Sequence, residues 1–572
     1  MVVAASREAC AGGRDVLAEG GNAVDAAVAV GFALAVSYPF AGNIGGGGFL
    51  IYRASAGEAE AIDFRETAPG LASREMFLGP NGEPDPDLSL WSPLAAGVPG
   101  TVAGLGLLHE RHGTVPWGRL LAPAVAMARD GIAVSRFQAE KLRDFSEHTM
   151  ADSVSRRILL DGGRYFSEGD TLRQPELAAT LARVARDGPQ EFYGGETARL
   201  LVEYMERIGG IITAEDLRVY RPVVREVLRG VHSGYTILSM PPPSSGGIAL
   251  LEMLNILEGF PLSKEGWGSA RGLHLVIEAM RQAYADRAAY LGDADFVPVP
   301  AAGLLDRGYA DSLRLRIVHA GNRPRTEAVP GRPAGAEAFL EAVGGSLGLG
   351  GAEGDETTHY SIVDGEGNAV SATVTLNAAY GSGLTVEGAG FLLNNEMDDF
   401  ASKPGASNDY GLIQGKANTV APHKRPLSSM TPVIVLFKGE DGGERLHLVT
   451  GSPGGSAIIT SVLQVVLNVL TYRMGIQEAV NAPRLHHQWM PDTVYVETSG
   501  WPAEVPRQLE AMGYAVRARE LPLGSTNSIF VDSTGTCFGA PDPRRSSHGM
   551  GFNRPSGSDG GLHRGSRTED LR

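Results

Sequence analysis

Residues 355–361, DETTHYS, follow a glycine-rich run at 344–354 and lead into a segment that favours β-strand, residues 358–364. A second β-favouring segment, residues 369–376, comes after a short turn that contains Gly365 and Gly367. Two such segments around a short glycine-containing turn predict a β-hairpin. The stretch therefore places Thr357 where a loop changes into a strand.

A hairpin centred on Glu366 pairs residues that lie equally far from it on both sides, so Thr357 is predicted to face Thr375. One face then carries polar side chains, namely Thr357, His359, Ser361, Ser371, Thr373 and Thr375. The other face carries Tyr360, Ile362, Val370, Ala372 and Val374. This alternation is typical of a sheet with one solvated face. The competing interpretation is chemical, because a threonine at a new chain N-terminus holds a hydroxyl nucleophile and an amine base in one residue.

Eleven sequence blocks bear on this choice, two of them within the hairpin itself. Around the hairpin the chain reads TTHYSIVD (357–364) and GNAVSATVTLN (367–377), followed by NNEMDDF (394–400), KRPLSSM (424–430), TGSPGGS (450–456) and NAPRLHHQW (481–489). Upstream it reads GGNAVDAA (20–27), GGGGF (45–49), DFRE (63–66), GVPGT (97–101) and PPSSGG (242–247). In this order the blocks resemble those of the γ-glutamyltransferases, members of the N-terminal nucleophile hydrolase superfamily. The resemblance covers roughly residues 2–545.

The resemblance implies an α+β fold, a four-layer α/β/β/α sandwich with two central, mainly antiparallel sheets. Periodicity alone predicts only a mixture of helices and strands. Helices are predicted at 6–19, 22–37, 101–130, 176–187, 195–208, 269–291 and 457–480. Strands are predicted at 48–53, 59–64, 234–239, 358–364, 369–376, 432–437, 446–450, 493–498 and 528–533. The resemblance further implies autocleavage into a large subunit (1–356) and a small catalytic subunit (357–545), which form a heterodimer within one interleaved fold.

Composition excludes several classes of protein. The chain is 43% hydrophobic and 20% charged, as expected for a globular protein with a large core. Its net charge of −16 argues against nucleic acid as a partner. No phosphate-binding loop, dinucleotide fingerprint or zinc-type spacing occurs, and the adjacent His486 and His487 would point to opposite faces of a strand. We therefore predict neither a metal nor a cofactor. Separately, the tail 546–572 is polar and rich in glycine, so we expect it to be disordered.

The sequence leaves the cellular compartment open. Cys10 and Cys537 lie far apart and do not form a disulfide framework. The N-terminal residues show no signal peptide, whereas the resemblance implies a periplasmic or extracellular protein. The apolar stretch from Ala23 to Ser37 is too short to span a membrane and predicts a buried helix.

The resemblance assigns Thr357 as the nucleophile, freed by cleavage of the Glu356–Thr357 bond. An α-amino group titrates near pH ~8, about two units below lysine, so a useful fraction can accept the hydroxyl proton. The glycine run before this bond fits a segment that is held in a strained geometry and then moves away. The resemblance also implies that Thr375 hydrogen-bonds the nucleophile, and that the N–H groups of Gly454 and Gly455 form the oxyanion hole.

A γ-glutamyl donor presents an α-carboxylate and an α-ammonium. By family match the carboxylate is bound by Arg65, Ser428 and Ser429, because a guanidinium and hydroxyls donate hydrogen bonds to it. The ammonium requires acceptors, and the matching residues are Asn377, Glu396 and Asp399. Residues 403–411 match a lid loop that some bacterial members carry, with Tyr410 as its gate.

The predicted function is that of a γ-glutamyltransferase and glutathione hydrolase. It forms a γ-glutamyl ester on Thr357 and passes the acyl group to water, an amino acid or a peptide. One alternative is a cephalosporin acylase, whose glutaryl substrate lacks the α-amine; the complete amine-binding set argues against it. Another is an unprocessed, non-catalytic binding protein, which a single intact band on a denaturing gel would favour. The balance of hydrolysis and transpeptidation and the preferred acceptor stay open.

Overall fold

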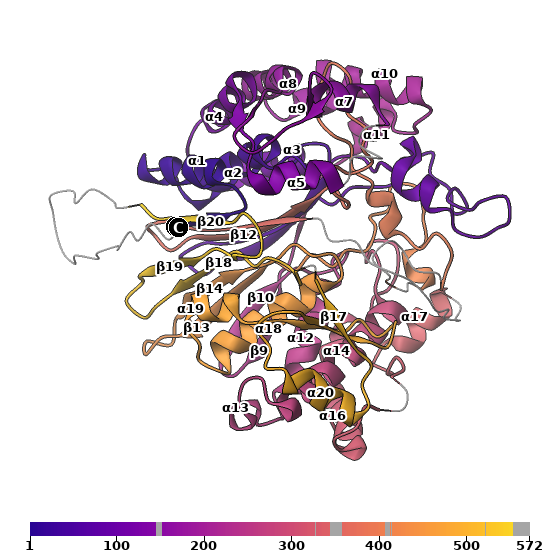
Figure 1. The fold of residues 1–572 in the computed structure, drawn as a ribbon, viewed down its shortest axis with the longest axis vertical. Coiled ribbons are helices and arrows are strands. Elements are labelled where there is room, and N and C mark those ends of the chain that lie inside the picture. Colours follow the sequence, from indigo (N-terminus) through magenta and orange to yellow (C-terminus); the bar gives the residue numbers. More distant parts are fainter. Residues whose placement is uncertain are drawn as a thin grey trace.

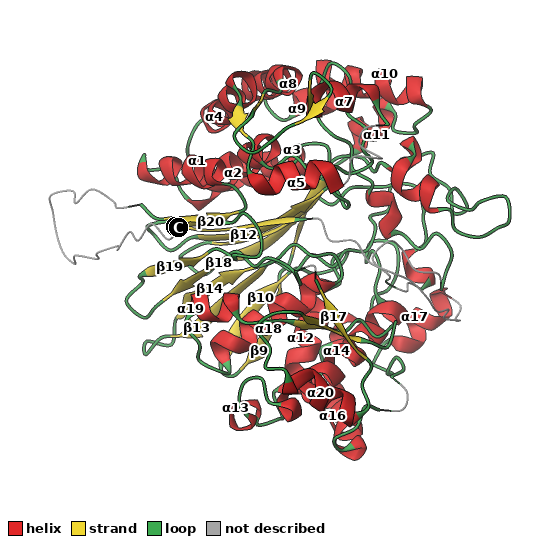
Figure 2. Cartoon of the chain, in the orientation of Figure 1, coloured by secondary structure: helices red, strands yellow, loops and turns green. Residues whose placement is uncertain are grey.

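Two β-sheets are stacked face to face in the middle of the molecule, and helices cover the outer side of each (Figures 1 and 2). The structure, a computed structural model, describes residues 1–144, 151–325, 328–343, 357–405, 412, 415–520 and 522–552. Burying one face of each sheet against the other and the second face against helices produces one continuous layered core. The predicted four-layer α+β sandwich is confirmed.

The first sheet has seven strands in the order β20-β1-β11-β12-β2-β3-β8, all paired antiparallel. Their bounds are His548–Met550 (β20), Val2–Ala4 (β1), Thr358–Val363 (β11), Ala369–Thr375 (β12), Gly47–Arg53 (β2), Ala59–Asp63 (β3) and Val223–Arg225 (β8). The hairpin β11–β12 thus lies between strands from the N-terminal part of the chain. The two parts that the predicted cleavage would separate are interleaved in this sheet.

The second sheet has six strands in the order β19-β18-β14-β13-β10-β9, again antiparallel. Their bounds are Cys537–Ala540 (β19), Ser528–Val531 (β18), Glu444–Thr450 (β14), Val433–Lys438 (β13), Tyr235–Ser239 (β10) and Leu228–His232 (β9). Smaller sheets are formed by Leu485–His486 (β15), Val494–Glu497 (β16) and Val516–Arg519 (β17), by Ile132–Ala133 (β4) with Thr171–Leu172 (β7), and by Leu160–Asp161 (β5) with Arg164–Tyr165 (β6).

The predicted hairpin register is confirmed, since Thr358 pairs with Val374 and Val363 with Ala369, symmetrically about Glu366. The expectation of a solvated face is wrong, because the second sheet covers it. Ser361 donates to the carbonyl of Asn527 (2.7 Å), which directly precedes β18. His359 contacts the Thr373 hydroxyl at 2.9 Å, and burial lowers the pKa of this histidine to about 3. The polar face is therefore an internally hydrogen-bonded layer between the sheets.

Helix α2 (Ala23–Ser37) is buried along its whole length against the apolar face of the hairpin, which confirms the predicted buried helix. Asn22 caps it by accepting the amide hydrogens of Val24 and Asp25. Its neighbours on this side of the molecule (Figure 1) are α1 (Arg7–Ala18), α3 (Thr101–His112), α4 (Trp117–Asp130), α5 (Arg136–Asp144), α7 (Ser153–Leu159), α8 (Pro175–Asp187), α9 (Gln190–Gly194), α10 (Glu196–Ile208) and α11 (Ala214–Val219).

The helices on the side of the second sheet include α12 (Gly246–Leu257), α13 (Leu262–Glu265), α14 (Ala270–Tyr290), α15 (Ala301–Leu304), α16 (Arg307–Ala320), α17 (Ala336–Val343), α18 (Ala457–Leu470), α19 (Ile476–Asn481) and α20 (Glu504–Met512). Two predicted helices are each interrupted. The segment 101–130 breaks at residues 113–116, where Pro116 cannot continue a helix, and 457–480 breaks before Gly475. None of the described helices combines the length and apolar character needed to cross a membrane.

The predicted start of a disordered tail at residue 546 is wrong, because residues 548–550 form β20 and pair with β1. A short strand at a sheet edge is stabilised by backbone hydrogen bonds, which a count of apolar side chains does not reveal. The predicted tail from residue 553 onward lies outside the described residues.

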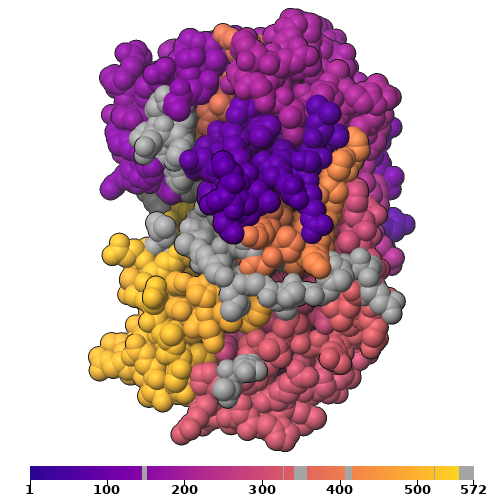
Figure 3. All heavy atoms as spheres, turned by 90° about the vertical axis from the view of Figure 1, so that its right-hand side faces the viewer, coloured from indigo at the N-terminus to yellow at the C-terminus, as the bar shows by residue number. Residues whose placement is uncertain are grey.

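In the space-filling view, orange segments that follow β12 in the chain lie beside indigo N-terminal residues (Figure 3).

Candidate active site

A pocket with about 280 Å³ of empty space opens beside the N-terminal end of β11. Nearly all of the predicted site residues line this pocket, and they come from both sides of the predicted cleavage site. The lining residues comprise Arg65, Thr357, Thr375, Asn377, Glu396, Asp399, Ser428, Ser429 and Gly455, together with Leu412, Met430 and Ile458, which the sequence did not single out. Residues more than 300 positions apart in the sequence thus share one cavity.

Thr357 lies directly before β11 with 4% of its surface exposed, and its hydroxyl oxygen is 3.4 Å from that of Thr375. The Thr375 hydroxyl also accepts the N–H of Asn377 (2.8 Å). Behind the strand, the Asn43 amide donates to the Thr375 carbonyl at 2.8 Å. The predicted partner of the nucleophile is therefore held through both its backbone and its side chain.

The glycines at 45–48 let the start of β2 approach these residues closely. A Cβ atom on Gly46 would clash with the carbonyl oxygen of Thr375, and one on Gly47 with that of Phe64. Only glycine tolerates such a backbone-to-backbone approach. The run thereby fixes the distance between the end of β12 and the turn that carries Arg65.

Arg65 follows β3 and is completely buried. Its guanidinium forms ion pairs with Glu396 and Asp399, and its Nε donates to the Pro426 carbonyl at 3.2 Å. Burial disfavours the charged form, but the neighbouring carboxylates outweigh it and raise the pKa of Arg65. The residue predicted to bind a carboxylate is thus paired with two of the residues predicted to bind an ammonium.

A third carboxylate, Glu66, lies beside this cluster, 3.7 Å from the guanidinium of Arg65. It is fully buried, and neither of its carboxylate oxygens has a hydrogen-bond partner among the described residues. Burial raises the pKa of Glu66 to about 7 and that of Glu396 well above its usual range. Glu66, Glu396 and Asp399 therefore bring more acidic groups to Arg65 than one guanidinium neutralises. Glu66 was missed by sequence reasoning, although it stands in the quoted DFRE block.

Ser428 and Ser429 are held by the segment before α12, through the Ser245 amide and hydroxyl, which both donate to the Ser428 carbonyl (2.7 and 2.6 Å). Asn377 adopts a left-handed backbone conformation (φ 75°), which asparagine tolerates better than most residues. Its side-chain amide donates to the Asn395 carbonyl at 3.0 Å. These contacts fix the backbone of both walls.

Gly454 and Gly455 form the turn that leads into α18, with φ values of 128° and 52° that favour glycine. Gly455 lines the pocket, and Gly454 is the residue before Gly455 in the chain. Across the part of the chain that the structure describes, neither glycine's N–H donates a hydrogen bond. Two uncommitted amides at a helix N-terminus suit the binding of an oxyanion.

Several predicted features lie elsewhere. Tyr410, the predicted gate, falls outside the described residues, although Leu412 lines the pocket. His486 bonds Thr460 (2.8 Å) and His487 bonds Asp492 (3.0 Å), and neither lines the pocket. Within the described ranges no group of three or more potential ligands could hold a metal ion.

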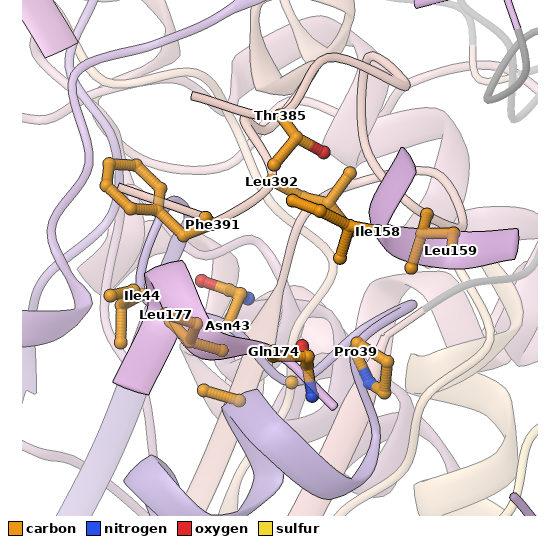
Figure 4. Close-up of a pocket in the computed structure, with 13 residues that line it drawn as sticks. Pro39, Asn43, Ile44, Ile158, Leu159, Gln174, Leu177, Thr385, Phe391 and Leu392 are labelled. Atoms are coloured by element: carbon orange, nitrogen blue, oxygen red, sulfur yellow. The ribbon is translucent and has the colours of Figure 1, made fainter. Parts of the chain in front are cut away.

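A second pocket lies between α2, α7, α8 and the segment that contains Phe391 and Leu392 (Figure 4). Its walls are mainly aliphatic, and its polar side chains are those of Asn43, Gln174 and Thr385. These described lining residues contain no acid or base. The second pocket therefore lacks the groups that acyl transfer requires. Asn43 lines it and donates to the Thr375 carbonyl.

Comparison with known proteins agrees with this geometry. A family model of gamma-glutamyltranspeptidases matches residues 9–552. The chain is 47% identical over 545 residues to the glutathione hydrolase proenzyme of Escherichia coli (strain K12), covering 95% of this chain and 90% of that protein. It superposes on a cephalosporin acylase from Bacillus halodurans with a TM-score of 0.81, 25% identity and coverage of 96% and 94%. For the Helicobacter pylori gamma-glutamyltranspeptidase the TM-score is 0.54, with 43% identity and coverage of 58% of this chain and 93% of that one. The chain therefore belongs to the gamma-glutamyltranspeptidase family.

Proposed function

We propose that the protein is a self-processing γ-glutamyltransferase and glutathione hydrolase that cleaves γ-glutamyl amides through an ester on Thr357. One observation carries the proposal: a single pocket joins the Thr357–Thr375 hydroxyl pair to the buried cluster of Arg65, Glu396 and Asp399. The first pair suits acyl transfer and the second suits an α-amino-acid head group. Release of aniline from a γ-glutamyl anilide by the purified protein tests the proposal, and complete inactivity of correctly cleaved protein would contradict it.

Processing comes first in the proposed sequence of events. The Thr357 hydroxyl attacks the carbonyl of Glu356, the peptide C–N bond breaks, and an ester forms while the Thr357 nitrogen takes up a proton. Water then hydrolyses the ester, which leaves a carboxylate on Glu356 and a free amine on Thr357. That amine is the base of the mature site. Since β11 and β12 lie between β1 and β2, the two fragments are expected to stay together as a heterodimer.

Turnover then follows two acyl-transfer steps. The amine of Thr357 accepts the hydroxyl proton while Oγ bonds to the γ-carbonyl carbon of the donor. The amides of Gly454 and Gly455 stabilise the oxyanion, and the leaving amine receives the proton. Water or the amine of an acceptor repeats the attack on the ester and restores Thr357. Such an exchange produces ping-pong kinetics.

Donor selection rests on the ion pairs of Arg65 with Glu396 and Asp399. Arg65 can exchange a carboxylate partner for the donor α-carboxylate only if another cation takes the place of Arg65 beside Glu396 and Asp399. The donor α-ammonium supplies that cation, so a zwitterionic head group exchanges one set of ion pairs for another. A glutaryl donor lacks the ammonium, which argues against the cephalosporin acylase alternative.

Replacing Arg65 tests the carboxylate contact. Arg65→Lys keeps the charge but loses the two-pronged donor geometry, and Arg65→Ala loses both. We expect kcat/KM for a γ-glutamyl anilide to fall by the equivalent of about 2–4 kcal/mol in Arg65→Ala, with a smaller loss in Arg65→Lys. Arg53→Lys, at a buried arginine on β2 outside the pocket, is the matched control. Unchanged kinetics in cleaved Arg65→Ala protein would remove Arg65 from the donor site.

The buried carboxylates predict a pH dependence of ligand affinity. Burial raises the pKa of Glu66 to about 7, and that of Glu396 is raised as well. An ammonium bound beside them favours their ionised forms, so the bound state holds fewer protons than the free state. Affinity for the product L-glutamate should therefore increase as the pH rises through this range toward about 7 and above.

Calorimetric titration of L-glutamate into the cleaved enzyme at several pH values, in buffers of different ionisation enthalpy, measures this proton release. Glu66→Gln removes one of the titrating groups, so its profile should be flatter than that of the wild type. An affinity that falls with rising pH, or no proton release, would refute the electrostatic description of the pocket.

A further inference from the structure

Arg287 lies near the end of α14, and its side chain is buried beside the pocket rather than in its wall. Its Nε donates to the Ser245 hydroxyl at 2.8 Å, and its Nη2 donates to the Ser429 hydroxyl at 3.3 Å. No ion pair within the described part of the chain involves this guanidinium. Burial accordingly lowers the pKa of Arg287 to about 10, which still leaves it charged at neutral pH.

The direction of these hydrogen bonds determines what the serines offer to a ligand. Because arginine only donates, the Ser429 oxygen must act as the acceptor, and its own proton points to a different partner. The Ser428 hydroxyl likewise accepts the Met430 N–H at 3.2 Å. Among the described residues, no acceptor is found for the proton of either serine hydroxyl. Both therefore have a proton to donate, and both line the pocket.

Arg287 also acts on the backbone of Ser428. The Ser245 hydroxyl accepts from Arg287 and donates to the Ser428 carbonyl at 2.6 Å, so one guanidinium braces both serines. A bulkier residue could not replace the glycine that follows Ser245, since a Cβ on Gly246 would clash with the Thr431 hydroxyl. Ser245 is thus held by its hydrogen bonds, and Gly246 by its close approach to Thr431.

We infer that Arg287 is a positioning residue that orients the Ser429 hydroxyl as a donor and places a fixed positive charge behind the serines, so that this wall selects ligands with a free α-carboxylate. The inference rests on the proposed function, because it specifies how that donor pocket reads the carboxylate. Arg65, which is proposed to bind the same carboxylate, is already paired with Glu396 and Asp399. Arg287 forms no ion pair with a described acidic residue. Its charge is therefore not neutralised by a directly contacting carboxylate.

The test compares two donors, a γ-glutamyl anilide and its α-carboxamide analogue, on cleaved wild-type and Arg287→Met enzyme. Arg287→Met should lower kcat/KM for the first donor by about 30-fold and for the carboxamide by less than about threefold. In a Ser429→Ala background the further effect of Arg287→Met should shrink to less than about threefold, since coupled residues are not additive. Arg271→Met, on the same helix but remote from the pocket, controls for the loss of an arginine.

Each outcome separates this inference from the proposed function. Equal losses for both donors, or full additivity with Ser429→Ala, would mean that Arg287 has only a structural role and would overturn the inference. A wild-type enzyme that does not discriminate between the donors would contradict the carboxylate site itself. If Arg287→Met does not fold, Arg287→Lys keeps the charge with fewer donors. It should show a loss of about three- to tenfold that is confined to the carboxylate donor.

Discussion

Thr357→Ala is expected to remain one intact chain, whereas the wild-type protein separates into two fragments on a denaturing gel. The smaller wild-type fragment should begin at Thr357. The reason is chemical, because alanine provides no oxygen to attack the Glu356 carbonyl and the ester cannot form. N-terminal sequencing of the separated bands measures the outcome directly. We expect no detectable cleavage of Thr357→Ala.

Thr358→Ala is the matched control, since Thr358 is the adjacent threonine and its buried hydroxyl has no hydrogen-bond partner among the described residues. It should be cleaved like the wild type. Thr357→Ser retains a hydroxyl and should also be processed. Correct cleavage of Thr357→Ala would exclude Thr357 as the processing nucleophile and would also disqualify it as the ester-forming residue.

The second large effect concerns the donor α-ammonium. γ-Glutamyl anilides should be cleaved at least ~100-fold more efficiently than glutaryl anilides, which corresponds to about 2.7 kcal/mol. A glutaryl donor draws Arg65 toward its own carboxylate and leaves Glu396 and Asp399 buried beside an apolar chain. A buried polar group without a partner costs roughly 1–3 kcal/mol, and more when it is charged. Values of kcat/KM for both anilides on the same preparation measure the ratio.

Asp399→Asn provides the control for this selectivity. It removes one negative charge while keeping a similar shape, so γ-glutamyl activity should fall while glutaryl activity changes little. The gap between the two donors should therefore narrow. Comparable kcat/KM values for both donors in the wild type would reject the γ-glutamyl assignment and favour a cephalosporin acylase.

The β11–β12 hairpin illustrates how far sequence reasoning extends. Its register followed from local turn chemistry and the period of two, and the structure confirms it at every pair from Thr358 to Val363. The burial of its polar face could not be predicted in the same way. The covering strands β14 and β18 come from residues 444–450 and 528–531, far along the chain. Alternation identifies which side chains share a face but not what covers that face.

The candidate pocket shows a similar division. Family blocks predicted Arg65, Glu396 and Asp399 as donor-binding residues, and the fold brings them to one cavity. The ion pairs among these three residues were not predicted, because a family motif indicates which ligand group each residue binds. It does not indicate which residues pair with one another. Arg287 was missed for another reason: it lies within a long helix and reaches the pocket wall by a hydrogen bond to Ser429. A buried arginine without an acidic partner becomes visible only in three dimensions.

In the proposed mechanism Thr357, freed at a chain N-terminus, carries the γ-glutamyl group during turnover. The most direct measurement is the intact mass of the small fragment after acid quenching of the enzyme during reaction with a γ-glutamyl anilide. We expect a species heavier by one γ-glutamyl group, with fragmentation assigning the added mass to Thr357. An adduct on another residue, or an unmodified fragment under conditions where aniline is released in a burst, would contradict it.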